Sequence, residues 1–368
     1  MTTDVMAPAS VMRAAFLGGG FMAAVHSRAA RAARATLAGA ASSSPERAVR
    51  AANALGIDRG FDSVEELVSA EGIDVVHVCT PNALHAEMTL AAIAAGKHVI
   101  CEKPLATSVA DAERVVAAAR EAGVLGTVPF VYRFHPLVRE ARDRIARGEL
   151  GRILSVDGAY LQDWLADPGA DDWRVDVASG GPSRAFADIG SHLCDLIEFV
   201  SGEPIVRLVA SARTVYADRA RTENVATEDV VALVVELAGG ALGSLLVSQV
   251  AQGRKNSLVF ELSGTDAAVR FDQEAPDTLW LGGPGASRVL SRGDELSADA
   301  ARLSLVPPGH PMGYQDAFNA FVADSYAAMR GAEPPDGLPT FEDGLRAVRV
   351  TAAVLASVRS GGWVEVAS

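Results

Sequence analysis

The sequence predicts an α/β protein of two domains: a parallel sheet flanked by helices, then an α+β domain with a large, mostly antiparallel sheet. From residue 11 to about 130, short β-branched runs alternate with Ala-rich segments whose charges recur at helical spacing, which is typical of a parallel sheet. After about residue 150, strand-like runs follow one another with hairpin-like connections, which is typical of an antiparallel sheet. Because 368 residues exceed one ordinary domain, we expect one domain at 1–130 and a second at 131–368.

The first domain is expected to contain strands in its apolar runs and helices in the charged segments between them. The clearest helices are SPERAVRAANALG at 44–56 and SVADAERVVAAAREAG at 108–123. The strands are expected at 11–19, 35–42, 73–80, 97–103 and 124–131.

The second domain is expected to begin with strands and end with helices. The run 229–250 is the most hydrophobic, but Glu236, Gly239 and Gly240 divide it into two strands joined by a turn rather than a membrane span. Helices are expected at 314–331 and 342–361, with the turn PPDGLP between them, and these helices can pack back on the first domain. The strands are expected at 153–164, 206–216, 229–237, 241–250, 256–264 and 267–272.

The composition argues against several classes of function. Lys and Arg number 33 and Asp and Glu 46, so the net charge of −13 is a poor match to nucleic acid or to an anionic membrane surface. Cys79, Cys101 and Cys194 form no CxxC pair and the seven histidines show no ligand spacing, so no metal and no disulfide is expected. The N-terminus has no early basic cluster of a signal peptide, and we expect a cytoplasmic protein.

A glycine-rich turn follows the first strand, in AAFLGGGFMAAVH at 14–26. Gly18, Gly20 and Ala23 match G-x-G-x-x-G/A between a strand and a helix. Such glycines let the backbone approach a pyrophosphate, whose charge the helix N-terminus stabilises. The turn predicts dinucleotide binding, in which Gly18, Gly20, Phe21 and Met22 contact the cofactor.

The end of the second strand leaves the choice of cofactor open. NAD-binding folds usually carry an acid there, but this chain has Ser42, Ser43 and Ser44, with no acid before Glu46. Ser42 and Ser43, with Arg47 nearby, can bind a ribose or a 2′-phosphate, whereas the other interpretation is a helix cap. We expect NAD, with NADP not excluded.

Polar residues follow the third and fourth strands, in VHVCTPNALHAE at 76–87 and GKHVICEKPLA at 96–106. The carboxyl edge of a parallel sheet is where open α/β sheets bind ligands. The expected cofactor-binding residues here are Thr80, Pro81, Asn82, His85, Glu102 and Lys103.

The segment FADIGSHLCDLIEF at 186–199 predicts a buried helix with a polar stripe. At 3.6 residues per turn, Asp188, Ser191, His192 and Asp195 share one face, and apolar side chains cover the rest. A buried polar stripe needs partners or a cavity. Either His192 is a core residue held by an i,i+4 bond within its helix, or Asp188 and His192 form a catalytic pair.

Three of these motifs together resemble the Gfo/Idh/MocA oxidoreductase family: TPNALH at 80–85, CEKP at 101–104 and DIGSH at 188–192. The similarity runs from about residue 12 to the C-terminus. It implies an NAD(P)-binding Rossmann domain, a substrate-binding and oligomerisation domain, and a homodimer or homotetramer. It also implies that Lys103, often followed by a cis bond to Pro104, meets substrate near the nicotinamide, where Asp188 and His192 complete the catalytic site.

These residue types suit the reversible oxidation of a carbinol. His192 can take the hydroxyl proton near neutral pH as hydride leaves the carbon. Lys103 can stabilise the developing oxyanion, and Asp188 can orient substrate hydroxyls or the imidazole.

The substrate class is indicated by AYLQDWLADP at 159–168, which resembles a segment of the levoglucosan dehydrogenase and sugar-3-dehydrogenase branch of the family. Aromatic rings beside amide and carboxylate groups fit sugars, although each ring can equally be a core residue. The expected substrate-binding residues are Tyr132, Arg133, Gln162, Trp164, Trp173, Arg174, Arg184, Asp188 and His192.

Arg184 departs from the family pattern, because many relatives carry small residues before the catalytic pair. It stands one turn before Asp188, in SGGPSRAFADIGSH. It can be a structural partner of Asp188 or Asp195, an exposed side chain, or a forked contact to an anionic group on the sugar.

Three functions remain open. The first is oxidation of a secondary hydroxyl, at C3 of a pyranose sugar or glycoside. The second is an NAD-dependent glycoside hydrolase, in which transient C3 oxidation allows elimination, hydration and return of hydride. The third is a cofactor-bound sensor that has lost activity, against which the intact Lys103, Asp188 and His192 argue.

Overall fold

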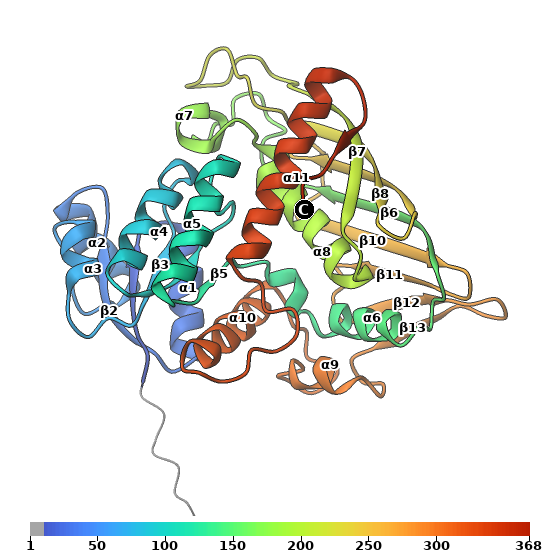
Figure 1. Cartoon of the computed structure of the whole chain (residues 1–368), viewed down its shortest axis with the longest axis horizontal. Coiled ribbons are helices and arrows are strands. Elements are labelled where there is room, and N and C mark those ends of the chain that lie inside the picture. Colours follow the sequence, from blue (N-terminus) through green and yellow to red (C-terminus); the bar gives the residue numbers. More distant parts are fainter. Residues whose placement is uncertain (1–10) are drawn as a thin grey trace, which may run out of the picture.

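The computed structural model describes residues 11–368, and its two sheets confirm the predicted fold class. Figure 1 shows the N-terminal domain beside the larger sheet, with the C-terminal helices between them. The expectation about a signal peptide concerns the N-terminal residues, of which 1–10 lie outside the described part.

The first sheet has five parallel strands in the order β2-β1-β3-β4-β5. The order reverses between β1 and β3, and ligands bind at such a switch point, beyond the carboxyl ends of the strands. The strands are β1 (Arg13–Leu17), β2 (Thr36–Ala41), β3 (Val75–Val78), β4 (His98–Cys101) and β5 (Gly126–Thr127). The helices are α1 (Phe21–Ala32), α2 (Pro45–Leu55), α3 (Val64–Ser69), α4 (His85–Ala94) and α5 (Val109–Ala122).

The second sheet has nine strands in the order β13-β12-β11-β10-β6-β9-β8-β7-β14, and its only parallel pair among the described residues is β6 with β9. The predicted antiparallel strands and the turn within 229–250 are confirmed. The strands are β6 (Ile153–Leu161), β7 (Ile205–Arg213), β8 (Val230–Leu237), β9 (Leu242–Ser248), β10 (Ser257–Gly264), β11 (Ala268–Asp272), β12 (Thr278–Gly282), β13 (Arg288–Ser291) and β14 (Val364–Glu365).

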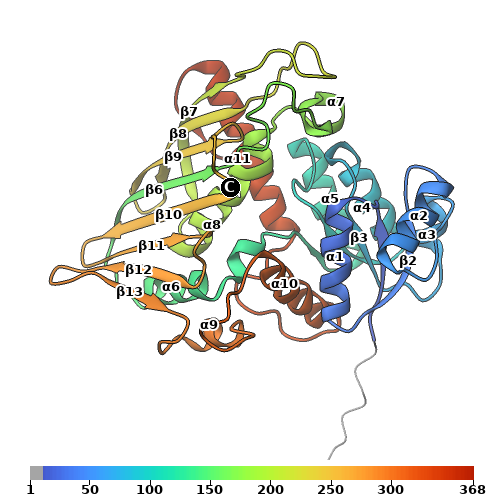
Figure 2. The same ribbon diagram turned by 180° about the vertical axis from the view of Figure 1, so that it is seen from behind.

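Alternation along these strands separates a buried face from an open one. Val231, Leu233 and Val235 of β8 are buried in the core beneath α8, whereas Val234 is exposed. Figure 2 shows the sheet from behind, with its strands side by side. The helices of this part are α6 (Pro136–Ala146), α7 (Val177–Gly180), α8 (Ser191–Ser201), α9 (Ala298–Arg302), α10 (Tyr314–Met329) and α11 (Phe341–Ser360).

The two C-terminal helices join the domains. Helix α10 packs against α1, and α11 lies against α5 on one side and β7 on the other. The first domain therefore contacts elements that are about 230 to 300 residues later in the chain. No helix within residues 11–368 is long and apolar enough to cross a membrane.

The helix at 186–199 differs from the predicted α-helix in its first turn. Phe186–Gly190 form a π-helical turn, in which the N–H of Ser191 donates to the carbonyl of Phe186, and α8 continues from it. A Cβ on Gly190 would lie 2.5 Å from the Phe186 ring, so this close approach requires glycine. π-Helical turns frequently occur at functional sites.

Candidate active site

A cavity of about 990 Å³ lies between the two domains. Every predicted cofactor residue lines it: Gly18, Gly20, Phe21, Met22, Ser42, Ser43, Arg47, Thr80, Pro81, Asn82, His85, Glu102 and Lys103. From the predicted substrate set, Tyr132, Gln162, Trp164, Trp173, Arg174, Asp188 and His192 line the same cavity. One space therefore contains the whole predicted cofactor set and most of the predicted substrate set, from residue 18 to residue 192 of the sequence.

The glycine turn fits a dinucleotide pyrophosphate. Gly18 has a φ of +103°, and a Cβ there would meet the carbonyl oxygen of Cys79 at 2.5 Å. Gly20 precedes the first residue of α1, and nothing lies within 4 Å of the position that an added Cβ would take. The backbone is thus open toward the cavity at the N-terminus of a helix of 12 residues, where an anion is stabilised.

At the end of β2, the serines have different roles. Ser44 caps α2, since its Oγ accepts from the N–H of Arg47 at 3.3 Å, and it donates to Glu46 at 2.7 Å. Ser43 accepts from Nη1 of Arg47 at 2.9 Å and lines the cavity, as Ser42 does. Ser42, Ser43 and Arg47 therefore lie together on the cavity wall at the end of β2.

The loops after β3 and β4 are tied together by His85. Its ring nitrogens lie 2.7 Å from the carbonyl oxygen of Pro104 and 2.9 Å from that of Thr80. Asn82 donates to the carbonyl of Gly180 at 2.9 Å and so links the first loop to the second domain. The bond between Lys103 and Pro104 is cis.

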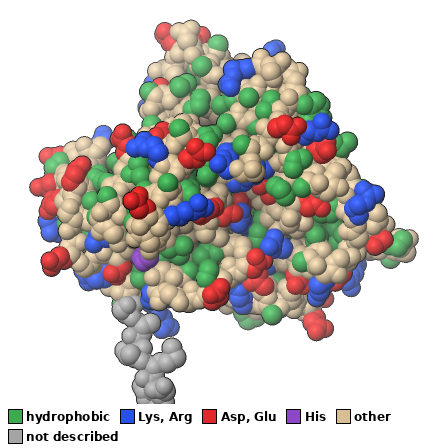
Figure 3. All heavy atoms as spheres, viewed as in Figure 1, with side chains coloured by type: hydrophobic (Ala, Val, Ile, Leu, Met, Phe, Trp, Pro, Cys, Tyr) green, Lys and Arg blue, Asp and Glu red, His purple; other side chains and the backbone are tan. Residues whose placement is uncertain are grey.

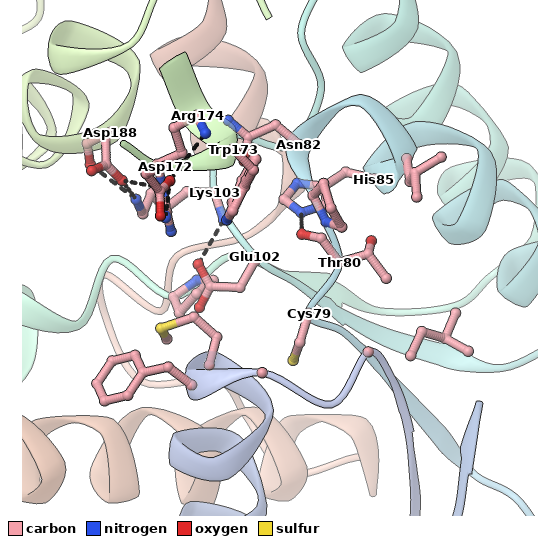
Figure 4. A pocket seen from close by; sticks show the side chains of 18 of the residues that line it. Cys79, Thr80, Asn82, His85, Glu102, Lys103, Asp172, Trp173, Arg174 and Asp188 are labelled. Carbon is pink, nitrogen blue, oxygen red and sulfur yellow. Dashed lines mark hydrogen bonds and ion pairs between the residues drawn. The ribbon is translucent and has the colours of Figure 1, made fainter. Parts of the chain in front are cut away.

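Lys103 and Asp188 meet across the domain boundary, and Figure 4 shows the two side chains pointing toward one another. Nζ of Lys103 donates to Oδ1 of Asp188 at 2.6 Å and to its backbone carbonyl at 2.9 Å. Gln249 donates to Oδ2 of Asp188 at 2.8 Å, and Nε of Arg174 lies 3.5 Å from Oδ1. Burial alone would raise the pKa of Asp188, but the charges of Lys103 and Arg174 outweigh it and hold the pKa well below its usual range.

His192 is a neutral imidazole beside this pair. Burial and then the charge of Lys103 lower its pKa to about 3. Its ring stands edge-on to Phe130 and Tyr132, with centroids 5.6 and 5.1 Å apart. Its Nδ1 has no hydrogen-bond partner among the described residues, and the oxygens of Asp188 bond elsewhere. The interpretation as a core histidine held by an i,i+4 bond is therefore wrong.

A polar network covers the second-domain wall. Gln162 donates to Oδ1 of Asn256 at 2.8 Å, and Nε1 of Trp164 donates to Oε1 of Gln162 at 2.9 Å. The hydroxyl of Tyr160 donates to the same oxygen of Asn256 at 2.7 Å and also bonds the hydroxyl of Tyr132. These linked donors and acceptors fix the orientation of Gln162 and Trp164.

Several cavity residues were missed from the sequence: Tyr160, Asp172, Asn256 and Tyr314, besides Gln249 behind Asp188. Tyr160 had a usable signal, because it is two residues from Gln162 and so shares its face of the strand. Asn256 and Gln249 stand at strand ends far from the recognised motifs, and no local pattern distinguishes them.

Two residues that were predicted to bind substrate lie away from the cavity. The cavity wall, as the described residues form it, includes neither Arg184 nor Arg133. Arg184 is fully buried and pairs with Asp229, which also binds Arg219 at 2.8 Å, so its partner is neither Asp188 nor Asp195. Arg133 is buried against Asp195.

Asp195 therefore belongs to a structural ion pair rather than to the cavity. Arg133 donates to both of its carboxylate oxygens and reaches Asp343 at 2.8 Å, which connects α8 to α11. Burial raises the pKa of Asp195 to about 7, although Arg133 opposes this shift.

Similarity to known proteins covers both domains. Residues 12–130 match the oxidoreductase family with an NAD-binding Rossmann fold, and residues 138–270 match the GFO/IDH/MocA C-terminal domain. The levoglucosan dehydrogenase of Pseudarthrobacter phenanthrenivorans is 31% identical over 388 residues, which cover 95% of this chain and 97% of the relative.

Solved structures show the same likeness. An oxidoreductase domain protein from Kribbella flavida is 34% identical with a TM-score of 0.90, and the match covers 98% of this chain and 100% of that one. A levoglucosan dehydrogenase in complex with NADH and levoglucosan is 31% identical with a TM-score of 0.90, covering 97% and 100%. The first domain is thus an NAD-binding Rossmann domain, and the chain belongs to the Gfo/Idh/MocA family of oxidoreductases.

Proposed function

We propose that this protein oxidises a secondary hydroxyl, at C3 of a pyranose sugar or glycoside, by hydride transfer to NAD. The observation that carries the proposal is the meeting of Lys103, Asp188 and His192 in a cavity that also contains the glycine turn. The likeness to a levoglucosan dehydrogenase over 95% of the chain supports a sugar as substrate.

The proposed roles follow from charge and protonation. Bound NAD would supply the hydride acceptor. The neutral imidazole of His192 accepts the hydroxyl proton, which an already protonated imidazole could not do. The ammonium of Lys103 stabilises the oxyanion that develops as the carbonyl forms. Asp188, ionised between Lys103 and Gln249, holds Lys103 in place and accepts from a neighbouring substrate hydroxyl.

The substrate wall suits a pyranose ring. Trp164 and Trp173 offer flat apolar surfaces for C–H faces, while Gln162 and Asn256 offer amide groups for hydroxyls. Arg174, whose guanidinium lies 4.3 Å from the centre of the Trp173 ring, is the cation at this end of the cavity. An anionic group on the sugar would therefore meet Arg174 instead of Arg184.

The test is a screen of pyranoses and glycosides with NAD and NADP that follows both reduced cofactor and released aglycone. The proposal predicts that reduced cofactor accumulates in step with a 3-keto product. Release of aglycone without net reduction would instead show the redox-neutral glycoside hydrolase. Cofactor binding without turnover of any sugar would contradict both and favour a sensor.

We also propose that the protein assembles as a homodimer or homotetramer through the open face of the second sheet. Leu154, Val234, Leu242 and Leu246 of three adjacent strands are between 40 and 53% exposed. Exposed apolar side chains gathered on one sheet face are typical of a protein interface. On the face seen in Figure 3, by contrast, acidic and basic side chains are interspersed.

A further inference from the structure

Four buried polar side chains form a continuous row behind the cavity. The hydroxyl of Tyr326 lies 2.6 Å from Nε2 of His77, and Nδ1 of His77 lies 2.8 Å from Nδ1 of His26. Nε2 of His26 lies 2.9 Å from Oε1 of Glu102. The row joins α10, β3, α1 and the end of β4, and no member is more than 5% exposed.

The surroundings of the row are apolar, so its members must satisfy one another. The ring of His77 stacks on Phe16 at 4.8 Å, and that of His26 lies 4.7 Å from Phe318. A buried polar group without a partner is costly, and a fully satisfied network fixes one geometry.

When Glu102 is a carboxylate and both imidazoles are neutral, the contacts permit one proton arrangement. His26 must then donate through Nε2, which leaves its Nδ1 as an acceptor. His77 must donate to that atom through Nδ1, because an N···N contact of 2.8 Å needs one proton between the nitrogens. Nε2 of His77 is consequently an acceptor, and the hydroxyl of Tyr326 donates to it.

Glu102 is the end of the row that reaches the cavity. Figure 4 shows it on the cavity wall next to Lys103, and its Oε2 accepts from the backbone N–H of Lys103 at 3.1 Å. Burial alone would raise the pKa of Glu102, but the hydrogen bond from His26 and the charge of Lys103 outweigh it, so the pKa is lowered. An ionised carboxylate at this point can accept from a cofactor hydroxyl.

We propose that His26, His77 and Tyr326 are positioning residues, which hold Glu102 as an oriented, ionised acceptor for the nicotinamide half of the cofactor. Helix α10, from the C-terminal part of the chain, thereby sets the geometry of a loop in the first domain. The proposal rests on cofactor binding in this cavity and is independent of which sugar is oxidised.

The first measurement is the tautomeric state of the histidines in the wild-type protein, by long-range ¹H–¹⁵N correlation on ¹⁵N-histidine-labelled protein at neutral pH. His26→Gln and His77→Gln assign the two signals among the seven histidines. The proposal predicts an Nε2–H tautomer for His26 and an Nδ1–H tautomer for His77. The opposite tautomer at either residue would overturn it, whatever the enzyme does with sugars.

The second measurement compares two adjacent buried hydroxyls of α10. Tyr326→Phe removes the donor of the row and keeps the ring. Ser325→Ala removes a buried hydroxyl that has no hydrogen-bond partner among residues 11–368. The dissociation constant for NADH, from fluorescence titration, should rise about five- to tenfold for Tyr326→Phe, the effect of one hydrogen bond.

Ser325→Ala should bind NADH within about twofold of wild type, because its hydroxyl makes no contact in the row. Equal affinity of the Tyr326→Phe protein and the wild type would overturn the proposal, since a purely packing role needs only the ring. If the wild-type protein turned over no sugar but the predicted tautomers and the predicted NADH affinities were found, the proposed reaction would be contradicted. The positioning role would still be supported.

Discussion

At the scale of single residues, the account depends on the charge states of Lys103, Asp188 and His192. The carboxylate of Asp188 accepts hydrogen bonds from Lys103 and Gln249, which lie outside its own helix. The imidazole of His192 is therefore free to receive a proton. Lys103 donates to Asp188 and lies in the loop that follows strand β4 of the first domain. The ion pair therefore joins the loop after β4 in the first domain to the π-helical turn at 186–190 in the second.

Lys103→Met should reduce kcat by at least about a hundredfold while NADH affinity stays within about threefold of wild type, because it removes the group that stabilises the oxyanion. Steady-state kinetics and a fluorescence titration measure the two effects. Lys97→Met, at the other end of β4, is the matched control and should behave as wild type. Retention of more than about a tenth of kcat would exclude the oxyanion role.

The buried histidines predict an acid-sensitive fold. Burial lowers the pKa of His135 to about 4, and burial with the charge of Lys103 lowers that of His192 to about 3. Between pH 6.5, the ordinary value, and about pH 4, the unfolded chain binds protons that the folded protein does not. The stability of the folded state therefore falls as the pH falls through this window.

His192→Gln removes one of these groups, so its Tm should depend less on pH between about 6.5 and 4 than that of wild type. Thermal melts across this window measure the slopes, and His310→Gln, at an exposed site, should keep the wild-type slope. Parallel slopes for the His192 variant and wild type would show that His192 does not stay neutral in the fold.

At the scale of elements, we expect the turn after β2 to determine the choice between NAD and NADP. Ser42→Asp places a carboxylate where the adenosine ribose is expected, and it should repel a 2′-phosphate. The ratio of the dissociation constants for NADPH and NADH should rise about tenfold, equivalent to ~1.4 kcal/mol. Ser44→Asp is the control, because it adds the same charge at the cap of α2, where Asp also caps well. An unchanged ratio in the Ser42 variant would place Ser42 away from the ribose.

Local motifs could be predicted from the sequence, whereas features that depend on distant partners could not. The glycine turn, the CEKP segment and the strands of the first sheet are each encoded within a few residues. Arg184 was misplaced because its partner, Asp229, lies 45 residues away. The π-helical turn was missed because an i,i+4 spacing of polar residues fits both kinds of helix.

The edge strands of the second sheet could not be predicted for the same reason, because they depend on partners elsewhere in the chain. Strands β12 and β13 were not predicted, since they are short, flank the loop GGPGAS and are only partly buried. β14 has only two residues, and it exists because α11 delivers them to the edge of β7. Such strands depend on the neighbouring strand more than on their own sequence.

At the scale of the whole molecule, the open sheet face predicts assembly. Leu246→Glu puts a charge within the proposed interface, where desolvation of an unpaired charge should weaken association by about 30-fold or more. Light scattering after size-exclusion chromatography measures the change in mass. Val49, on α2 of the first domain, is 50% exposed against 42% for Leu246, and Val49→Glu should leave the mass unchanged. A wild-type monomer, or an unchanged mass for Leu246→Glu, would contradict the proposed interface.

The central claim is that hydride leaves C3 of a pyranose for NAD in the cavity that Lys103, Asp188 and His192 share. Its most direct test uses the pyranose identified by the screen, with deuterium at C3, and follows the label by mass spectrometry and NMR. The account predicts that deuterium appears on the reduced nicotinamide, and that Lys103→Met forms this product at least about a hundredfold more slowly. Reduced cofactor without the label, or label that stays on the sugar while product forms, would contradict it.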